Sequence, residues 1–153
     1  GEGFNWLVPK LGAVLVSAHR GLLVWHPVFA LSIIGLWLGR KLDLGMVVAS
    51  ISSLLLQWYL ISSWHSWTQG DAFGGRMFIV CTPVFALGLG YLVHWLVERA
   101  LCGWVWLTSG AILIWNFLLF IVYRFDLVLR SAPPTWYDIT IRRVTYVVDW
   151  IVR

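Results

Sequence analysis

Apolar residues gather into four long, uncharged stretches that are separated by short polar connections. The stretches cover about 21–39, 44–64, 77–97 and 104–123. A bilayer core requires about 20 consecutive, mostly apolar residues per helix. In lipid a helix satisfies its own backbone hydrogen bonds, whereas a lone strand does not. The pattern therefore predicts an all-α integral membrane protein, in which a bundle of four transmembrane helices occupies residues 21–123.

The segments that flank the predicted bundle do not have the length and composition of further spans. Residues 11–18 are apolar but far too short to cross a bilayer, so residues 1–20 are predicted to form a re-entrant or interfacial segment. In the tail, 124–153, two prolines at 133 and 134 break the chain. Beyond them, apolar residues recur at 141, 144, 148 and 151, which predicts an amphipathic helix in the membrane surface.

The connections between spans define two faces of the predicted bundle. The short connections 40–43 and 98–103 lie at one face, which we name face B. The N-terminal segment, the loop 65–76 and the tail lie at the opposite face, face A. Of the eleven Lys and Arg, three (Arg40, Lys41 and Arg99) lie at face B and the other eight at face A. By the positive-inside rule, this count alone favours a cytoplasmic face A.

The composition excludes several classes of protein. Hydrophobic residues make up 60% of the chain and charged residues only 12%, whereas a soluble domain carries about 25% charged residues. A freely soluble domain, a disordered chain and a disulfide-rich secreted module are thus excluded. The net charge of +4 is spread between apolar runs without a basic stripe, so membrane lipids rather than nucleic acid are the expected partners.

Histidines raise the question of a bound haem or pigment. His26 lies near the face A end of the first span and His94 near the face B end of the third. These spans run in the same direction, so the two side chains differ in depth by roughly 18 Å and cannot ligate one haem iron. Each remains a candidate for ligating a chlorophyll-type pigment or a haem alone, against the plainer interpretation of a hydrogen-bonded membrane histidine. No metal-ligand spacing such as His-x-x-x-His occurs, and no metal site is predicted.

Small and polar residues within the spans favour packing roles. Gln57 and Asn116 lie in the second and fourth spans, where interhelical hydrogen bonding is the expected role. Gly35 and Gly39 form a Gly-x-x-x-Gly spacing that allows a neighbouring helix to approach closely.

The face A loop holds the residues best suited to a polar ligand. Its glycines allow tight turns and close approach of the backbone to a ligand. Asp71 can accept hydroxyl protons, Arg76 can bind phosphate with its guanidinium, and the ring of Trp67 can stack on a sugar. An interfacial turn with aromatic residues and a snorkelling arginine explains the same residues equally well.

Three segments of the chain resemble, in order and spacing, those of one family. Residues 17–27 (SAHRGLLVWHP) are similar to a Ser-x-Arg-His-Gly-Leu-Phe-x-Trp-x-Pro segment that opens a span. Residues 70–78 (GDAFGGRMF) are similar to a Trp-x-Gly-Gly-x-Ser-Phe-Gly-x-Arg loop, and residues 133–138 (PPTWYD) to a Pro-x-x-Trp-x-Asp ending. The chain thus resembles the C-terminal part of bacterial GT-C superfamily (glycosyltransferase 39-like) integral membrane proteins.

This resemblance implies a polyprenyl-phosphate sugar donor at the extracytoplasmic face of a bacterial inner membrane, with face A outside. Candidate donor headgroup and phosphate contacts are Asp71, Arg76, His19, Arg20 and Trp67. The catalytic acidic residue of that family lies near the N-terminus of a much longer chain, in a part that this sequence lacks. The resemblance therefore implies a donor-handling portion, with or without catalysis of its own.

An accessory transmembrane subunit is the alternative from a different class. In that interpretation the 12 Trp offer contact surfaces to partner helices, quinones, lipids or pigments within a respiratory or photosynthetic complex. The expected partners are accordingly membrane lipids, together with other transmembrane subunits or a preceding part of the same gene product.

Overall fold

The computed structural model describes residues 3–18, 21–68 and 76–124, with isolated positions at 135, 137, 141, 145 and 148. Its helices are α1 (Leu11–Val16), α2 (Leu22–Trp25), α3 (Val28–Gly39), α4 (Leu44–Ser63), the 3₁₀ helix η1 (Arg76–Cys81), α5 (Thr82–Glu98) and α6 (Cys102–Arg124). Among the described residues, β pairing is limited to one isolated bridge between Phe4 and Trp64. The predicted all-helical architecture is therefore confirmed.

Within the described residues, three helical segments are long and apolar enough to cross a membrane, which supports the membrane-protein prediction. They are Leu44–Ser63, Arg76–Glu98 and Cys102–Ile121. They correspond to the second, third and fourth predicted spans. The helix of the first predicted span, Val28–Gly39, is shorter than these three.

The first predicted span differs from the expectation of one continuous helix over 21–39. The helix stops at Trp25 and restarts at Val28, and His26 between them has φ −134° and ψ 73°. Pro27 accounts for the break, because its ring disfavours helical geometry in the preceding residue and its nitrogen has no proton to donate. A helix of 12 residues remains beyond the break.

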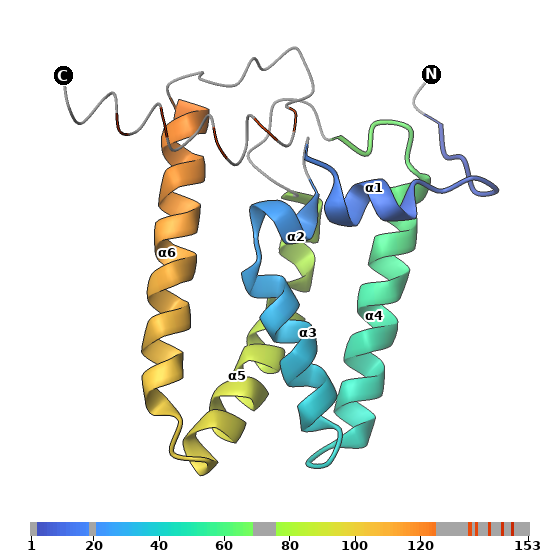
Figure 1. Ribbon diagram of the computed structural model, residues 1–153. Coiled ribbons are helices and arrows are strands. Elements are labelled where there is room, and N and C mark those ends of the chain that lie inside the picture. Colours follow the sequence, from blue (N-terminus) through green and yellow to red (C-terminus); the bar gives the residue numbers. More distant parts are fainter. Residues whose placement is uncertain are drawn as a thin grey trace.

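Helix α4 begins where Asp43 caps it. Oδ1 of Asp43 accepts a hydrogen bond from the backbone N–H of Met46 at 2.9 Å, which satisfies one of the unpaired donors of the first turn. The connection between α3 and α4 is correspondingly short, and it lies at the same end of the bundle as the connection between α5 and α6 (Figure 1). This end is face B, as the sequence predicts.

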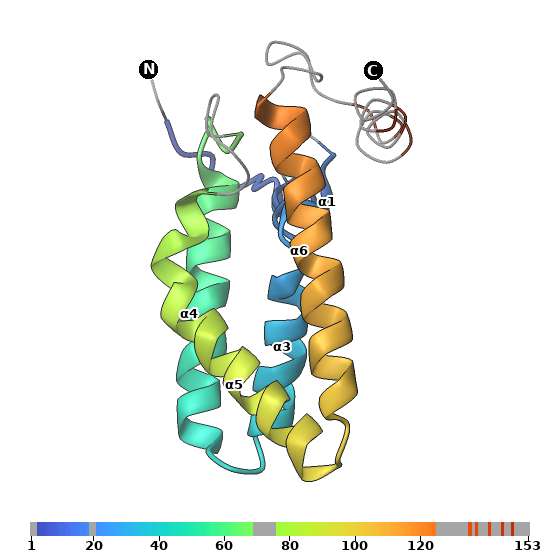
Figure 2. The same ribbon diagram turned by 90° about the vertical axis from the view of Figure 1, so that its left-hand side faces the viewer.

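Helices α3 and α5 cross closely and form the centre of the bundle (Figures 1 and 2). A Cβ atom built on Gly35 would lie 2.7 Å from the carbonyl carbon of Gly88, and one built on Gly39 would meet the ring of Tyr91. The hydroxyl of Ser32 donates to the carbonyl oxygen of Phe85 at 2.7 Å across the same crossing. The small-residue spacing in α3 thus allows close helix approach, as predicted, and its partner is α5.

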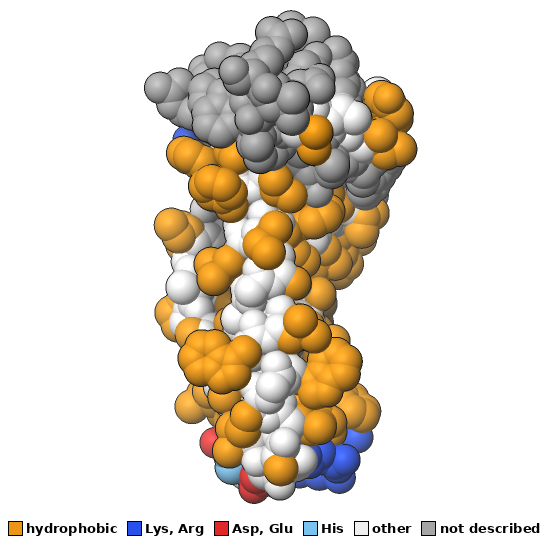
Figure 3. All heavy atoms as spheres, turned by 60° about the vertical axis from the view of Figure 1, so that its left-hand side comes forward, with side chains coloured by type: hydrophobic (Ala, Val, Ile, Leu, Met, Phe, Trp, Pro, Cys, Tyr) orange, Lys and Arg blue, Asp and Glu red, His pale blue; other side chains and the backbone are white. Residues whose placement is uncertain are grey.

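The remaining elements surround this pair. Helices α4 and α6 lie on opposite sides of it, while α1 lies across the face A end (Figure 1). Apolar side chains cover most of the length of the face shown in Figure 3, and charged side chains gather at its lower end, which is face B. The predicted interfacial helix of the tail lies almost wholly outside the described residues.

Candidate functional site

The N-terminal segment is fixed to the face A end of α4 by backbone hydrogen bonds. The last carbonyl groups of a helix have no partner within it. Here the N–H of Asn5 donates to the carbonyl of Ser63 at 2.6 Å, and the N–H of Lys10 donates to the carbonyl of Ser62 at 2.8 Å. These bonds position residues 3–10 and the start of α1 over the end of the helix.

Aromatic side chains of α4 strengthen this attachment. The hydroxyl of Tyr59 donates to the carbonyl oxygen of Trp6 at 2.8 Å, and Nε1 of Trp58 donates to the carbonyl oxygen of Leu11 at 3.1 Å. Each ring therefore satisfies its polar atom while its apolar body packs against the segment. Residues 3–16 consequently form a cover at face A, with α1 lying crosswise (Figure 1).

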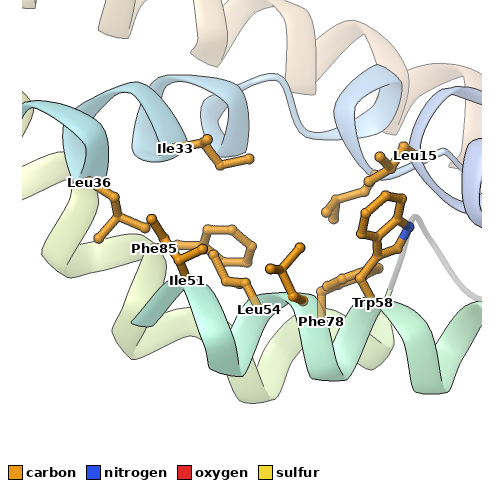
Figure 4. Close-up of a pocket in the computed structure, with 10 residues that line it drawn as sticks. Leu15, Ile33, Leu36, Ile51, Leu54, Trp58, Phe78 and Phe85 are labelled. Atoms are coloured by element: carbon orange, nitrogen blue, oxygen red, sulfur yellow. The ribbon is translucent and has the colours of Figure 1, made fainter. Parts of the chain in front are cut away.

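An apolar groove of about 210 Å³ lies beneath this cover. Leu22, Leu36, Phe78 and Phe85 are nearly inaccessible and form its floor, with exposed fractions between 0% and 3%. The more exposed side chains along its edge come from α3 and α4; these are Ile33, Ile51 and Leu55. Leu15, Trp58 and Phe78 lie together toward one end of the groove, and Leu36 and Ile51 lie toward the other (Figure 4). The groove therefore extends from face A toward the middle of the bundle and opens between α3 and α4.

Two of the sequence-predicted site residues lie at the face A end of this groove. Trp67 packs against the buried cluster that contains Phe78. Arg76 is exposed and begins η1, two residues before Phe78. Trp67 therefore packs against the cluster that the groove shares, and Arg76 precedes Met77 and Phe78 of the same cluster, but neither residue lines the groove itself. Asp71, His19 and Arg20 lie outside the described residues.

Lys10 is a further cation at this end that sequence reasoning did not select. Its Nζ lies 5.8 Å from the centroid of the Trp67 ring, within cation–π range. The sequence gives only a weak signal for this pairing, because the pairing depends on the backbone bond that holds Lys10 to the end of α4. Face A thus offers an ammonium, a guanidinium and an indole in the described part of the chain.

The described acidic side chains lie at the face opposite to Lys10 and Arg76. The two described carboxylates, Asp43 and Glu98, both belong to face B, where Asp43 caps α4 and Glu98 ends α5. The described part of face A therefore has groups that bind anions and apolar chains rather than a carboxylate base. No group of three or more His, Cys, Asp or Glu that could hold a metal ion occurs among the residues that the structure describes.

His26 lies at the break between α2 and α3, where it meets α6. Its side chain is hydrogen-bonded with that of Asn116, and Nε1 of Trp115 donates to the carbonyl oxygen of Val24 at 3.0 Å. The side chain of Asn116 also donates to the carbonyl oxygen of Ile112 at 2.9 Å within α6. The interhelical role expected of Asn116 is therefore confirmed, and its partner is the candidate ligand His26.

His94 lies near the opposite face. It is in the last turns of α5, and its Nε2 lies 3.3 Å from Oε1 of Glu98. The bundle thus separates His26 and His94 along its length, as the sequence predicts. Each has a polar partner within the chain, which is the plainer of the two interpretations of a membrane histidine.

Gln57 links α4 with the start of the next span. Its Nε2 donates to the carbonyl oxygen of Met77 at 3.2 Å, and Met77 lies between Arg76 and Phe78. The interhelical hydrogen bond predicted for Gln57 is therefore confirmed. It also fixes the backbone beside Arg76 relative to the groove.

Comparison with known proteins gives no relative from which a role could be transferred. No family model, curated protein or solved structure matches the chain.

Proposed function

We propose that this chain is the membrane-embedded portion of a protein that handles polyprenyl-phosphate sugars, with the lipid phosphate at face A and the proximal isoprene units in the groove between α3 and α4. The observation that supports the proposal is a site with an apolar groove and cationic groups near one end, as an amphiphilic ligand requires. A wholly apolar groove of about 210 Å³ ends at face A beside an exposed guanidinium and an ammonium over an indole ring.

The chemistry of each part matches one part of such a ligand. Arg76 binds phosphate oxygens through paired N–H donors, and Lys10 adds a second positive charge nearby. Trp67 provides an aromatic surface for a sugar. The groove is open along the edge formed by Ile33 and Leu55, so a chain already in the bilayer enters it sideways without crossing water.

The proposal includes four crossings of the membrane, in which α2 and α3 together form a broken first span. Face A is then extracytoplasmic and the face B turns, which contain Arg40, Lys41 and Arg99, are cytoplasmic. Catalysis of sugar transfer requires a carboxylate base. The two described carboxylates belong to face B, and Asp71, the carboxylate predicted at face A, lies outside the described residues, so the described residues of face A are assigned to donor binding.

The test is binding of a polyprenyl-phosphate hexose to the protein in lipid nanodiscs, measured by native mass spectrometry. We expect Arg76→Gln to lower the bound fraction by about fivefold, since one cation near a membrane surface contributes about 1 kcal/mol toward an anionic lipid. Arg40→Gln at face B is the matched control. Equal binding by the two variants would refute the role of Arg76.

A second pair of variants tests the groove itself. Leu55 lines the groove and Leu56, its neighbour on α4, does not, although both are more than half exposed at 52% and 62%. Leu55→Trp should therefore reduce binding of the polyprenyl lipid, and Leu56→Trp should leave it unchanged. A Leu55→Trp variant that binds normally would remove the groove from the proposal.

An accessory-subunit function remains the second candidate, and the surface of α6 favours it. Only 6% of its membrane-spanning window is buried within the chain. Large side chains at Trp104, Trp106 and Phe117 are exposed on it. Partner helices that cover this surface should co-purify with the protein at fixed stoichiometry in detergent. Trp106→Ala, which removes a large exposed side chain without changing the charge, should release them. A monodisperse protein without partners would count against this function.

A further inference from the structure

A second apolar opening lies on the other side of the α3–α5 pair. It is a crevice of about 330 Å³ between this pair and α6. Its walls are Val28 and Leu31 from α3; Leu89, Leu92, Val93 and Leu96 from α5; and Val105, Thr108, Ser109, Ile112 and Leu113 from α6. Val93 and Leu113 are 40% and 70% exposed, so the crevice opens to the surroundings of the bundle.

The crevice exists because α6 is attached to the rest of the bundle mainly at its two ends. Near face A, Leu119 is buried against Ala18 and Trp25, and Trp115 donates to the carbonyl of Val24. At face B, the short turn after α5 connects it to α6. Between these attachments, α6 diverges from α5, as Figure 1 shows.

The lining favours a hydrocarbon chain over water. Apolar side chains form almost the whole wall, and the hydroxyl of Thr108 already donates within α6, to the carbonyl of Trp104 at 2.7 Å. A buried water requires two to four polar partners, and besides Thr108 the lining offers only the hydroxyl of Ser109. An empty crevice would forfeit the dispersion energy of its walls. In a bilayer, the available filler is a lipid chain.

A cation, Arg99, lies on the turn just beyond the face B end of the crevice, outside its lining. Leu96 lines the crevice, and the backbone N–H of Arg99 donates to the carbonyl of Leu96 at 3.3 Å. The guanidinium carbon of Arg99 lies 4.4 Å from the centroid of the Trp95 ring, which holds the exposed side chain at the membrane edge. The adjacent carboxylate of Glu98 pairs with His94. Within the described ranges, no carboxylate forms an ion pair with Arg99.

We infer that this crevice is a binding site for an anionic phospholipid, with one acyl chain between α6 and the α3–α5 pair and the headgroup phosphate on Arg99. Charge complementarity selects the headgroup, because a guanidinium forms paired hydrogen bonds with phosphate oxygens. The site is separate from the groove of the proposed function. It lies on the other side of α3 and α5 and ends at the opposite face, so either proposal can fail without the other.

The experiment is native mass spectrometry of the full chain in nanodiscs that contain equal amounts of phosphatidylglycerol and phosphatidylcholine. The wild-type protein should retain phosphatidylglycerol in preference to phosphatidylcholine. Arg99→Gln should reduce the retained phosphatidylglycerol by about fivefold, from the contribution of one surface cation. Equal retention of the two lipids by the wild type would overturn the proposal.

Arg40→Gln is the matched control for the headgroup. Arg40 also lies at a face B turn and also stacks on an indole ring, 4.0 Å from the centroid of Trp37. Trp37, three residues before Arg40, does not line the crevice, whereas Leu96, three residues before Arg99, does. Retention should stay at the wild-type level in this variant. An equal loss in Arg40→Gln and Arg99→Gln would indicate general surface attraction and overturn the site.

A second variant tests the chain independently of charge. Ser109→Phe fills the crevice from an exposed position on α6, and Leu107→Phe places the same ring on α6 outside the crevice. We expect Ser109→Phe to lower retention of phosphatidylglycerol and Leu107→Phe to preserve it. Unchanged retention in Ser109→Phe would show that no chain occupies the crevice.

Discussion

Replacement of Gly88 by Ala tests whether the close crossing of α3 and α5 holds the bundle together. A Cβ atom at this position would lie 2.9 Å from the carbonyl carbon of Ser32, and closer still to its carbonyl oxygen and hydroxyl. The optimum carbon–carbon separation is about 3.5–4.0 Å, so relief of the clash requires the helices to move apart by about 1 Å. Two of these three contacts are with backbone atoms of Ser32, which cannot rotate away.

The expected cost follows from three contributions. Overpacking of a tight interface costs about 1–3 kcal/mol. Displacement of Ser32 also weakens its 2.7 Å hydrogen bond to the carbonyl of Phe85, and such bonds contribute about 0.6 kcal/mol in a membrane. The higher helix propensity of Ala acts in the opposite direction by at most about 1 kcal/mol. We therefore expect Gly88→Ala to lower the free energy of unfolding by about 1–3 kcal/mol.

Gly90→Ala is the matched control, because Gly90 lies on the same helix and a Cβ there meets no atom within 4 Å. Its free energy of unfolding should stay equal to that of the wild type or rise slightly. Unfolding by SDS in mixed micelles, followed by tryptophan fluorescence, measures both variants. If Gly88→Ala proved as stable as Gly90→Ala, the close crossing would not be a source of stability and the reasoning would be refuted.

Three further predictions concern other parts of the bundle. Asp43→Ala removes the cap of α4 and should cost about 1 kcal/mol in the same unfolding assay, whereas Asp43→Asn should keep most of that stability; equal stabilities would contradict the capping role. Trp115→Phe keeps an aromatic side chain but loses the 3.0 Å bond to the carbonyl of Val24 and should lower the SDS midpoint; a midpoint like that of the wild type would show that this bond does not secure α6. Cys102 is exposed and Cys81 is buried, so maleimide should modify the folded protein at Cys102 alone, and prompt double labelling seen by mass spectrometry would argue against the packing around Cys81.

The pattern of apolar residues predicts most of the fold because it reports directly on each helix. Length and composition suffice to predict the three long helices and the pairing of the short turns at face B. The break in the first span is different. Uniform hydrophobicity over 21–39 favours one helix, and only Pro27 carries the signal that the helix stops. A local pattern also cannot say which helix packs against Gly35, since α3 and α5 are not consecutive.

The sequence predicts only part of the candidate site, because a local pattern does not report contacts between residues far apart in the chain. Trp67 and Arg76 follow from the residue types of one loop, and in the structure Trp67 packs against the buried cluster that contains Phe78, while Arg76 lies two residues before Phe78. Lys10 does not follow, because its place above Trp67 depends on a backbone bond to Ser62 over 50 residues away in sequence. Similarly, the pairing of His26 with Asn116 arises only when α6 folds back beside the broken span.

The α3–α5 pair lies between the two proposed lipid sites, which end at opposite faces of the bundle. Phe85 of α5 lines the groove that ends at face A, and Leu89 and Leu92 of the same helix line the crevice that ends at face B. A change in the separation of α3 and α5 must therefore alter both sites, whereas a change of either arginine alters one. We expect Gly35→Ala to lower retention of the polyprenyl lipid and of phosphatidylglycerol together, when both are measured in one native mass spectrum. Loss of only one lipid from this variant would show that the two sites do not share a wall.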